Sequence, residues 1–220
     1  MKNLELILTE IFKPKIGQHV NRMELLGAIM MIFSLYYLSV FGYQYYSREN
    51  AQIQSLEAAE KKLEIENLSV PKIDARNDKI MNFSAVYNEP LGTVEIPKLN
   101  RKLPLIEGTD ANVLDQGVGH FTGTVFPGQN EQILISGHRD TVFRNFDRLE
   151  IGDQFIINMP YGSYTYEIRS TVIVHADDTT VIRKMGEEVL VVSTCYPFNY
   201  IGDAPDRFVI YAYPVKNEQE

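Results

Sequence analysis

The strongest constraint on this chain is a stretch of 22 residues without a charge, from Leu25 to Tyr46. As a helix, this stretch would be about 33 Å long, which is enough to cross the hydrocarbon core of a bilayer. Its C-terminal end carries several tyrosines, which is where membrane helices place interfacial aromatic residues. The sequence therefore predicts a single transmembrane anchor over residues 25–46.

Two other interpretations of this stretch are weaker. A buried core helix is seldom this long and this free of charge. A cleaved signal peptide has an apolar region of about 7–15 residues followed by a small-x-small site, and no such site follows closely here. Basic residues precede the anchor, whereas only Arg48 follows it closely. The positive-inside rule then puts residues 1–24 in the cytoplasm and the residues after 47 outside.

Residues 47–89 are expected to separate the anchor from a domain. Residues 47–69 contain no Gly or Pro and are rich in helix-forming residues. They predict a solvated helical stalk rather than a coiled coil, because their heptad pattern is broken. Pro71 would end this helix, and the polar residues up to 89 would form a linker.

Composition and charge limit the function of the remaining residues, 90–220. The chain is 45% hydrophobic and 23% charged, which is typical of a globular protein and excludes a disordered one. Its net charge is −8, from 21 basic and 29 acidic side chains. Residues 90–220 contribute −7, with 11 basic against 18 acidic side chains. A nucleic-acid-binding protein needs the opposite surplus.

Residues 90–220 predict a mainly β domain, because short runs of β-forming residues alternate there with Gly and Pro turn signals. Two short helices are expected over 110–116 and 142–149, each too short to form a layer. The pattern indicates a small β-barrel or sandwich. The seven expected strands are residues 92–96, 103–106, 132–136, 154–159, 163–174, 188–194 and 207–213.

The chain contains one cysteine, Cys195. It can form neither an intrachain disulfide nor a Cys-rich zinc site. Outside the cytoplasm, an unpaired cysteine is buried and inert, joined to another chain, or a working thiol. Cys195 follows the apolar run at residues 188–194, and side chains beside loops at strand ends often carry function. Its position therefore favours a working thiol.

A nucleophilic thiol needs an acid/base partner and a group that stabilises an oxyanion. His138 also follows an apolar run, which ranks it ahead of His120 and His175 without excluding them. Arg207 begins the strand that would pair with the strand of Cys195, so its guanidinium would lie near the thiol. The alternative for Arg207 is a surface ion pair with a nearby aspartate.

Three segments resemble the signature sequences of sortases: SGHRDT at 136–141, VVSTC at 191–195 and DRFVIYAY at 206–213. The order His, Cys, Arg and the separations of 57 and 12 residues agree with that family, and the resemblance extends over residues 90–215. The usual pattern before the cysteine is T-L-x-T-C, and valines occupy its first two positions here. The residue pattern around the HRDT segment most resembles that of the class D branch.

Sortases are membrane-anchored cysteine transpeptidases of Gram-positive bacteria, so the resemblance implies an eight-stranded β-barrel behind an anchor and a stalk. It implies that Cys195 attacks the Thr carbonyl of an LPxT-type sorting signal in a secreted protein. An amine of peptidoglycan or its precursor would then resolve the thioacyl-enzyme. By the same resemblance His138 is the general acid/base and Arg207 holds the substrate and the oxyanion. Thr194 would contact the substrate, and His120 would be structural or line the substrate site.

The resemblance implies no required cofactor and no metal site. In some sortases, acids near the loop before the nucleophile strand bind calcium. Acidic pairs stand there at residues 177–178 and 187–188, and a solvated loop is the preferred interpretation. Asp140 could orient His138 from two residues away, although a solvated acid is again the preferred interpretation.

Other protein classes fit less well. L,D-transpeptidases place an Arg two residues after the Cys, where this chain has Pro197. Papain-like and NlpC-type peptidases place the Cys before the His. The remaining alternative is a membrane-tethered, non-catalytic cell-wall scaffold in which Cys195 is only a core residue.

Overall fold

The structure is a computed structural model that describes residues 22–67, 80–199 and 202–215. The chain divides into two compact units, one that ends at Tyr46 and one that begins at Ser47. Most of the expected cytoplasmic segment, and the part of the linker that contains Pro71, lie outside the described residues. The domain boundaries drawn from the sequence therefore stay predictions.

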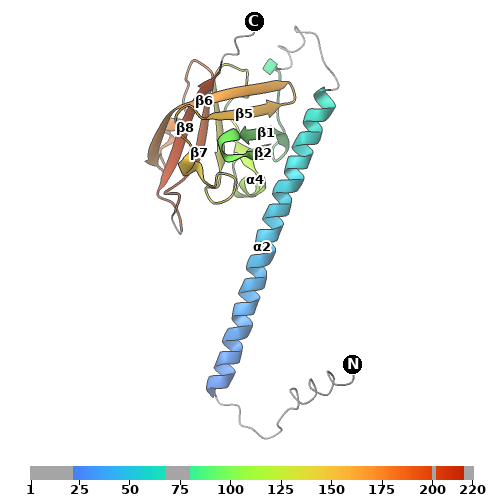
Figure 1. The fold of residues 1–220 in the computed structure, drawn as a ribbon, viewed down its shortest axis with the longest axis vertical. Helices are drawn as coiled ribbons and strands as arrows, with labels where there is room; N and C mark the ends of the chain where they lie inside the picture. The colour runs from blue at the N-terminus through green and yellow to red at the C-terminus, as the bar shows by residue number, and fades with distance from the viewer. Residues whose placement is uncertain (1–21, 68–79, 200–201, 216–220) are drawn as a thin grey trace. The chain divides into compact units, whose positions relative to one another are not determined.

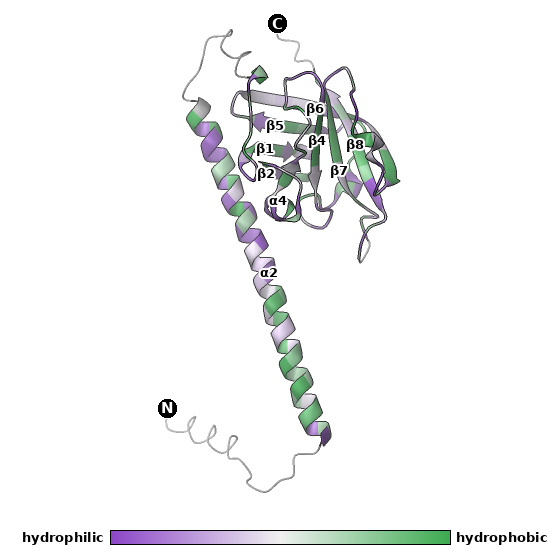
Figure 2. Cartoon of the chain, turned by 180° about the vertical axis from the view of Figure 1, so that it is seen from behind, coloured by the Kyte–Doolittle hydropathy of each residue, from purple (hydrophilic) through white to green (hydrophobic). Residues whose placement is uncertain are grey.

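The expected anchor and stalk belong to one long helix, α2 (Arg22–Asn67). Its N-terminal part is predominantly hydrophobic and its C-terminal part is more hydrophilic (Figure 2). An 18-residue window of this helix has a mean hydropathy of 1.9 and is 0% buried within the protein. A core helix would bury such side chains, whereas this window is unburied, which favours the anchor over the core-helix interpretation. The length and composition of α2 are those of a membrane anchor.

The second unit contains a closed eight-stranded β-barrel (Figure 1). Around the barrel the strands follow the order β1-β2-β3-β4-β7-β8-β6-β5. Most neighbours are antiparallel, but β2 pairs with β3 and β4 pairs with β7 in parallel. The strands are β1 (Pro90–Ile96), β2 (Arg101–Glu107), β3 (Val118–His120), β4 (Gln132–Gly137), β5 (Gln154–Met159), β6 (Gly162–His175), β7 (Val189–Tyr196) and β8 (Asp206–Pro214).

The mainly β fold class is confirmed, and the barrel was one of the two architectures that the strand pattern allowed. All seven expected strands are present, with ends that differ by a few residues. The eighth strand, β3, is only three residues long and lies in a glycine-rich segment. It is too short to show an alternating pattern, and its pairing with β2 and β4 defines it.

Of the two expected short helices, one is present. Helix α4 (Ala111–Gln116) begins after Asp110, whose side chain accepts a hydrogen bond from the backbone N–H of Asn112. The expected helix over 142–149 is wrong, because only a 3-10 turn, η2 (Phe146–Arg148), forms there. Asn145 adopts a left-handed conformation with φ of 68°, which interrupts a right-handed helix. Two more 3-10 turns are η1 (Pro97–Leu99) and η3 (Thr179–Val181).

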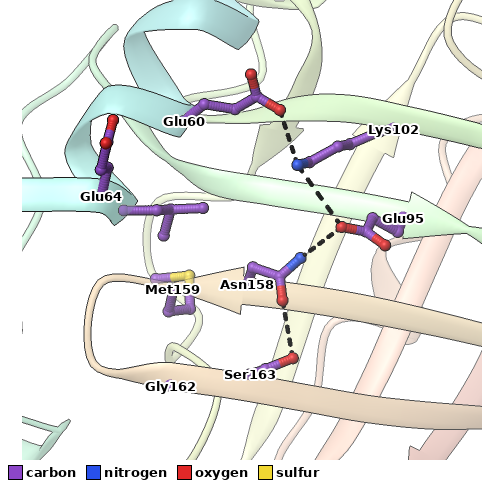
Figure 3. Close-up of a pocket in the computed structure, with 9 residues that line it drawn as sticks. Glu60, Glu64, Glu95, Lys102, Asn158, Met159, Gly162 and Ser163 are labelled. Atoms are coloured by element: carbon purple, nitrogen blue, oxygen red, sulfur yellow. Dashed lines mark hydrogen bonds and ion pairs between the residues drawn. The ribbon is translucent and has the colours of Figure 1, made fainter. Parts of the chain in front are cut away.

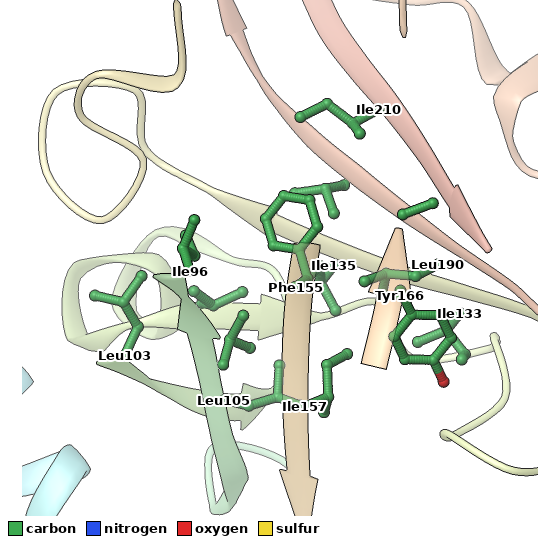
Figure 4. Packing of buried hydrophobic residues seen from close by; sticks show 14 of the residues in the cluster. Ile96, Leu103, Leu105, Ile133, Ile135, Phe155, Ile157, Tyr166, Leu190 and Ile210 are labelled. Atoms are coloured by element: carbon green, nitrogen blue, oxygen red, sulfur yellow. The ribbon is translucent and has the colours of Figure 1, made fainter. Parts of the chain in front are cut away.

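The hydrophobic core fills the inside of the barrel, with aromatic and branched side chains from all sides (Figure 4). Successive side chains of a strand point to opposite faces, so β7 contributes Leu190 and Val192 to this core. On the opposite face of β7, Val189 and Val191 belong to a second cluster on the outside of the barrel. We call this second cluster the outer apolar patch; its buried members are Leu134, Val189, Val191 and Val209.

Candidate active site

Three neighbouring strand ends carry the residues that the sequence singled out. In the parallel pair β4–β7, Gly137 lies opposite Thr194, so one further step brings His138 level with Cys195. In the antiparallel pair β7–β8, Cys195 lies directly opposite Arg207. Side chains directly opposite each other have Cβ atoms about 4.5–5.5 Å apart. The topology therefore brings the imidazole, the thiol and the guanidinium to one end of three adjacent strands.

The thiol lies on the outer face of the barrel. Residues 190 and 192 of β7 face the core, and 189 and 191 face the outer apolar patch, so alternation puts Cys195 on the outer face. Its side chain is half-buried, and the side chain of His138 is 35% exposed. A reagent or a substrate can therefore approach Cys195, which an inert core cysteine would not allow.

Arg207 is held by backbone carbonyls. Its Nη1 donates hydrogen bonds to the carbonyl oxygens of Ala204 at 3.2 Å and Asp206 at 2.9 Å. Within residues 22–67, 80–199 and 202–215, no carboxylate lies within ion-pair distance of its guanidinium. The surface ion pair considered from the sequence is therefore not formed there. A guanidinium has five N–H donors, and these bonds engage only one of its nitrogens.

The loop between Cys195 and Arg207 is fastened by Arg139, a residue that sequence reasoning missed. Its Nη1 donates to the carbonyl oxygen of Pro197 and its Nη2 to that of Gly202, both at 3.1 Å. Because Arg139 directly follows His138, its side chain ties both ends of this loop to the end of β4. The only sequence signal was its place in the SGHRDT segment beside the histidine.

Thr194 faces the barrel interior. Its side chain is 3% exposed, and its hydroxyl donates a hydrogen bond of 2.8 Å to the carbonyl oxygen of Gly137. This bond joins the end of β7 to the end of β4, immediately before Cys195 and His138. The expected substrate contact of Thr194 stays a prediction, and the structure gives its hydroxyl a structural partner.

His120 lies in the interior of the protein, where it is 1% exposed. Its Nδ1 lies 2.6 Å from Oε2 of Glu107, and its Nε2 lies 3.1 Å from the carbonyl oxygen of Val125. Thr122 donates a hydrogen bond to the other oxygen of Glu107 at 2.7 Å. Phe126 stacks on the imidazole with ring centroids 4.5 Å apart. Protein acceptors thus occupy both ring nitrogens, so contact of this ring with a substrate stays a prediction.

The charge of Glu107 depends on this network. Burial acts to raise the pKa of Glu107, but the hydrogen bonds from His120 and Thr122 outweigh burial and hold that pKa below its ordinary value of 4.5. An ionised carboxylate in the interior needs such donors. The network also joins β2 to β3 and to the loop before β4, so it supports the strand that carries His138.

The carboxylate nearest to His138 comes from a distant part of the sequence. Asp140 is exposed, and its backbone carbonyl accepts hydrogen bonds from Arg144. Asp115 of α4 places Oδ1 3.7 Å from Nε2 of His138. Sequence reasoning missed Asp115, because nothing in the sequence indicates that α4 lies beside the end of β4.

The loop between β6 and β7 is attached to the start of β4. The side chain of Gln132 donates to the carbonyl oxygen of Val181 at 2.8 Å and accepts from the backbone N–H of Arg183 at 3.1 Å. Glu131 accepts from the backbone N–H groups of Met185 and Gly186 at 2.6 and 3.3 Å. Half-buried Val181 and Met185 pack against the outer apolar patch. The loop thereby forms one wall beside the patch.

A cavity of about 580 Å³ lies elsewhere on the second unit. Its lining includes Glu60 and Glu64 of α2 and residues of β1, β2, β5 and β6 (Figure 3). Lys102 contacts Glu60 at 2.7 Å and Glu95 at 3.8 Å across the cavity. None of its lining residues belongs to β4, β7 or β8. The cavity is therefore separate from the three strand ends described above.

Comparison with known proteins decides the family. The sequence profile of the sortase domain matches residues 94–215, more than half of the chain. The chain belongs to the sortase family. Sortases are cysteine transpeptidases, and sortase family members act on proteins that carry a sorting signal. The resemblance seen in the three sequence segments is thus confirmed.

Individual relatives also bear on the branch of the family. This sortase is 50% identical over 131 residues to Sortase D of Bacillus subtilis (strain 168), a match that spans 59% of this chain and 66% of that protein. It is 41% identical to the catalytic domain of B. anthracis SrtD, with a TM-score of 0.53 over 61% of this chain and 93% of that one. These matches confirm the resemblance to class D.

A more distant solved structure supports the fold. The Clostridium perfringens Sortase D5 transpeptidase is 24% identical and has a TM-score of 0.62 over 76% of this chain and 99% of that one. At this identity the likeness concerns the barrel architecture alone, which agrees with the eight-stranded order observed here.

The buried pair of Glu107 and His120 gives a testable pH dependence. A carboxylate whose folded-state pKa is lowered stabilises the protein above its ordinary pKa, and this contribution is lost as the pH falls through the lower, folded-state value. We therefore expect Glu107→Gln to be less stable than the wild type at pH 7 by about 1–3 kcal/mol. The difference should shrink as the pH falls below 4.5, the ordinary value for Glu107.

Urea unfolding of the full-length protein in detergent, followed by near-ultraviolet circular dichroism at pH 7 and at lower pH, measures both quantities. The matched control is Glu187→Gln, which removes an exposed carboxylate and should leave the free energy of unfolding unchanged. A deficit for Glu107→Gln that stays constant with pH would contradict the role of its charge.

Proposed function

We propose that this sortase cleaves an LPxT-type sorting signal after its Thr and transfers the secreted protein to an amine of peptidoglycan or its precursor. The observation that carries the proposal is the strand register, in which Gly137 lies opposite Thr194 and Cys195 lies opposite Arg207. These pairings put His138, Cys195 and Arg207 at adjacent strand ends. The half-buried apolar side chains that pack against the outer apolar patch would contact the apolar residues of the signal.

In the first step, the thiolate of Cys195 attacks the Thr carbonyl carbon and forms a tetrahedral intermediate. Arg207, with N–H donors left over from its two backbone bonds, would stabilise the developing oxyanion. The C–N bond then breaks, and His138 gives a proton to the leaving amine. The products are a thioacyl-enzyme and the C-terminal part of the signal.

In the second step, the amine of the acceptor attacks the thioester carbon. His138 takes up the proton that this amine loses, and the C–S bond breaks to return the thiolate of Cys195. One amide bond is thus exchanged for another, without an oxidant or a reductant. Because a thiolate attacks without a base, His138 is free to carry its proton to the leaving group.

We further propose that the reaction needs no calcium. Two carboxylates beside the loop before β7, Glu131 and Glu188, already accept hydrogen bonds from protein donors. Glu188 accepts from the backbone N–H groups of Gly128 and Asn130 and from the hydroxyl of Tyr166. The backbone N–H of Met185, helped by those of its neighbours, holds the pKa of Glu131 below its ordinary value. Hydrogen bonds between protein groups thus attach this loop to the strand beside it.

The partners of the proposed reaction are secreted proteins with a C-terminal sorting signal and a wall-precursor amine. A single-pass protein with its N-terminus in the cytoplasm would present the barrel to both. The excess of Lys and Arg before residue 25 supports this orientation, and the apolar, unburied α2 supports the anchor.

Cys195→Ala should abolish cleavage of an LPxT-containing peptide, and Arg207→Lys should lower kcat/KM by about 10²–10³, because Lys lacks the guanidinium fork. The control Arg148→Lys, at an exposed position, should react at the wild-type rate. Peptide cleavage is followed by chromatography, and mass spectrometry detects the thioacyl-enzyme on Cys195.

If Cys195→Ala still links substrate proteins to the wall, the protein is not the enzyme proposed. In that case the non-catalytic scaffold remains, with Cys195 as a structural residue. A wild-type rate for Arg207→Lys would remove Arg207 from the mechanism while leaving the nucleophile in place. Circular dichroism of each variant shows whether the barrel is folded.

The calcium proposal predicts equal rates with and without the ion. Peptide cleavage by the full-length protein in detergent should differ by less than about twofold between excess calcium and excess chelator, because loop order does not depend on a cation. Glu131→Gln weakens the attachment of the loop and should lower kcat/KM in both conditions alike. Activation by calcium in the wild type would contradict the proposal.

The orientation can be tested with the single cysteine of the chain. A membrane-impermeant maleimide should label half-buried Cys195 in intact cells, because the barrel is expected outside. In a Cys195→Ala background, Asn3→Cys should be labelled only after the cells are permeabilised. The reverse pattern would show that the barrel faces the cytoplasm.

A further inference from the structure

Asp115 and His138 form a pair, and Asp115 has no role in the mechanism proposed above. Oδ1 of Asp115 lies 3.7 Å from Nε2 of His138, and the two side chains are 33% and 35% exposed. Asp115 is the one acidic residue within ion-pair distance of His138 in the part of the chain that the structure describes. The two residues are far apart in sequence, so the fold alone brings them together.

The strand register explains why Asp115 lies there. Strand β3 pairs with β4 antiparallel, with Gly119 opposite Ser136 and His120 opposite Ile135. Extended by two residues, this register puts position 117 level with His138. Helix α4 ends at that point, and the backbone N–H of Gly117 donates to the carbonyl oxygen of Val113. Asp115, in the last turn of α4, is therefore held beside the end of β4.

A second charged group contacts the same carboxylate oxygen. Nε of Arg48, in α2, lies 3.3 Å from Oδ1 of Asp115, and the Arg48 side chain is 54% exposed. The side chain of Gln52, one helical turn later, donates to the backbone carbonyl of Asp115 at 3.4 Å. One carboxylate thus lies between a guanidinium and an imidazole, and its negative charge is shared between them.

We propose that Asp115 is a positioning residue for His138, whose carboxylate holds a proton on Nε2 and stabilises the imidazolium, and that Arg48 weakens this hold by binding the same oxygen. The inference rests on the proposed function, in which His138 carries a proton to the leaving amine. With the carboxylate of Asp115 beside Nε2, a proton is favoured on that nitrogen, which leaves Nδ1 to exchange protons with the substrate.

The chemical consequence concerns the fraction of active enzyme. Catalysis needs the thiolate of Cys195 and the imidazolium of His138 in the same molecule, and a nearby carboxylate favours the imidazolium. Loss of that carboxylate lowers the fraction of molecules with both charges. The rate and the acidic limb of the pH–rate profile should then change together, which a merely structural contact would not produce.

The test compares four variants of the full-length protein in detergent. Asp115→Asn removes the charge and keeps the shape, Asp115→Glu restores a carboxylate, and Arg48→Gln removes the competing cation. Asp140→Asn is the matched control, since it removes one exposed acidic charge only two residues from His138. Nuclear magnetic resonance of labelled histidines gives the titration midpoint of His138, and the spectrum of His138→Gln assigns its signal among the four histidines.

For Asp115→Asn we expect the titration midpoint of His138 to fall by about half a pH unit to one pH unit. Its kcat/KM for the peptide should fall about three- to tenfold, with the acidic limb of the profile moved by the same interval. Asp115→Glu should recover most of both changes. Arg48→Gln should move the midpoint upward, and Asp140→Asn should match the wild type.

An unchanged midpoint in Asp115→Asn, or an equal change in Asp140→Asn, would overturn the proposal. The titration needs no substrate, so it separates this inference from the proposed function. If the wild type leaves the LPxT peptide intact while the midpoint of Asp115→Asn moves as expected, the pairing stands and the proposed substrate is wrong.

Discussion

The structure depends above all on the pairing register of β4, β7 and β8. A slip of one residue in β7 would turn every side chain of the strand to the opposite face, and Cys195 would then point into the barrel. The register is fixed because β7 is apolar on both sides, with Val192 in the barrel core and Val191 in the outer apolar patch. Neither side chain can be exposed without losing buried contacts.

Around this sheet, polar side chains hold backbone groups of the loops that surround the site. Arg139 fastens the loop between Cys195 and Arg207, and Glu131 fastens the loop before β7. In the interior, the buried pair of Glu107 and His120 joins β2 to β3 and to the loop before β4. Such bonds hold a loop at several backbone atoms without adding apolar surface. The loops around Cys195 are thereby held in position, while the half-buried thiol stays accessible to a substrate.

The proposed role of Asp115 extends this arrangement to the proton chemistry. A carboxylate shared by Arg48 and His138 is a weaker partner for each of them than an unshared one. The charge state of the site would then respond to a residue of α2 as well as to the barrel itself. The proposed enzyme needs a thiolate and an imidazolium together, so a modest electrostatic contribution would act directly on the fraction of active molecules.

The sequence by itself predicted the long apolar helix, the β class and seven of the eight strands, and it singled out Cys195, His138 and Arg207 as candidate site residues. These features are local, because an uncharged run, an alternating strand and a signature segment are each visible within a few residues. Only the tertiary structure decided which face Cys195 occupies, that β3 exists, and that the segment at 142–149 is no helix. It also brought Asp115 to His138 and Arg139 to Pro197. Those relations depend on strand register and on loop closure between distant segments, which no short stretch of sequence encodes.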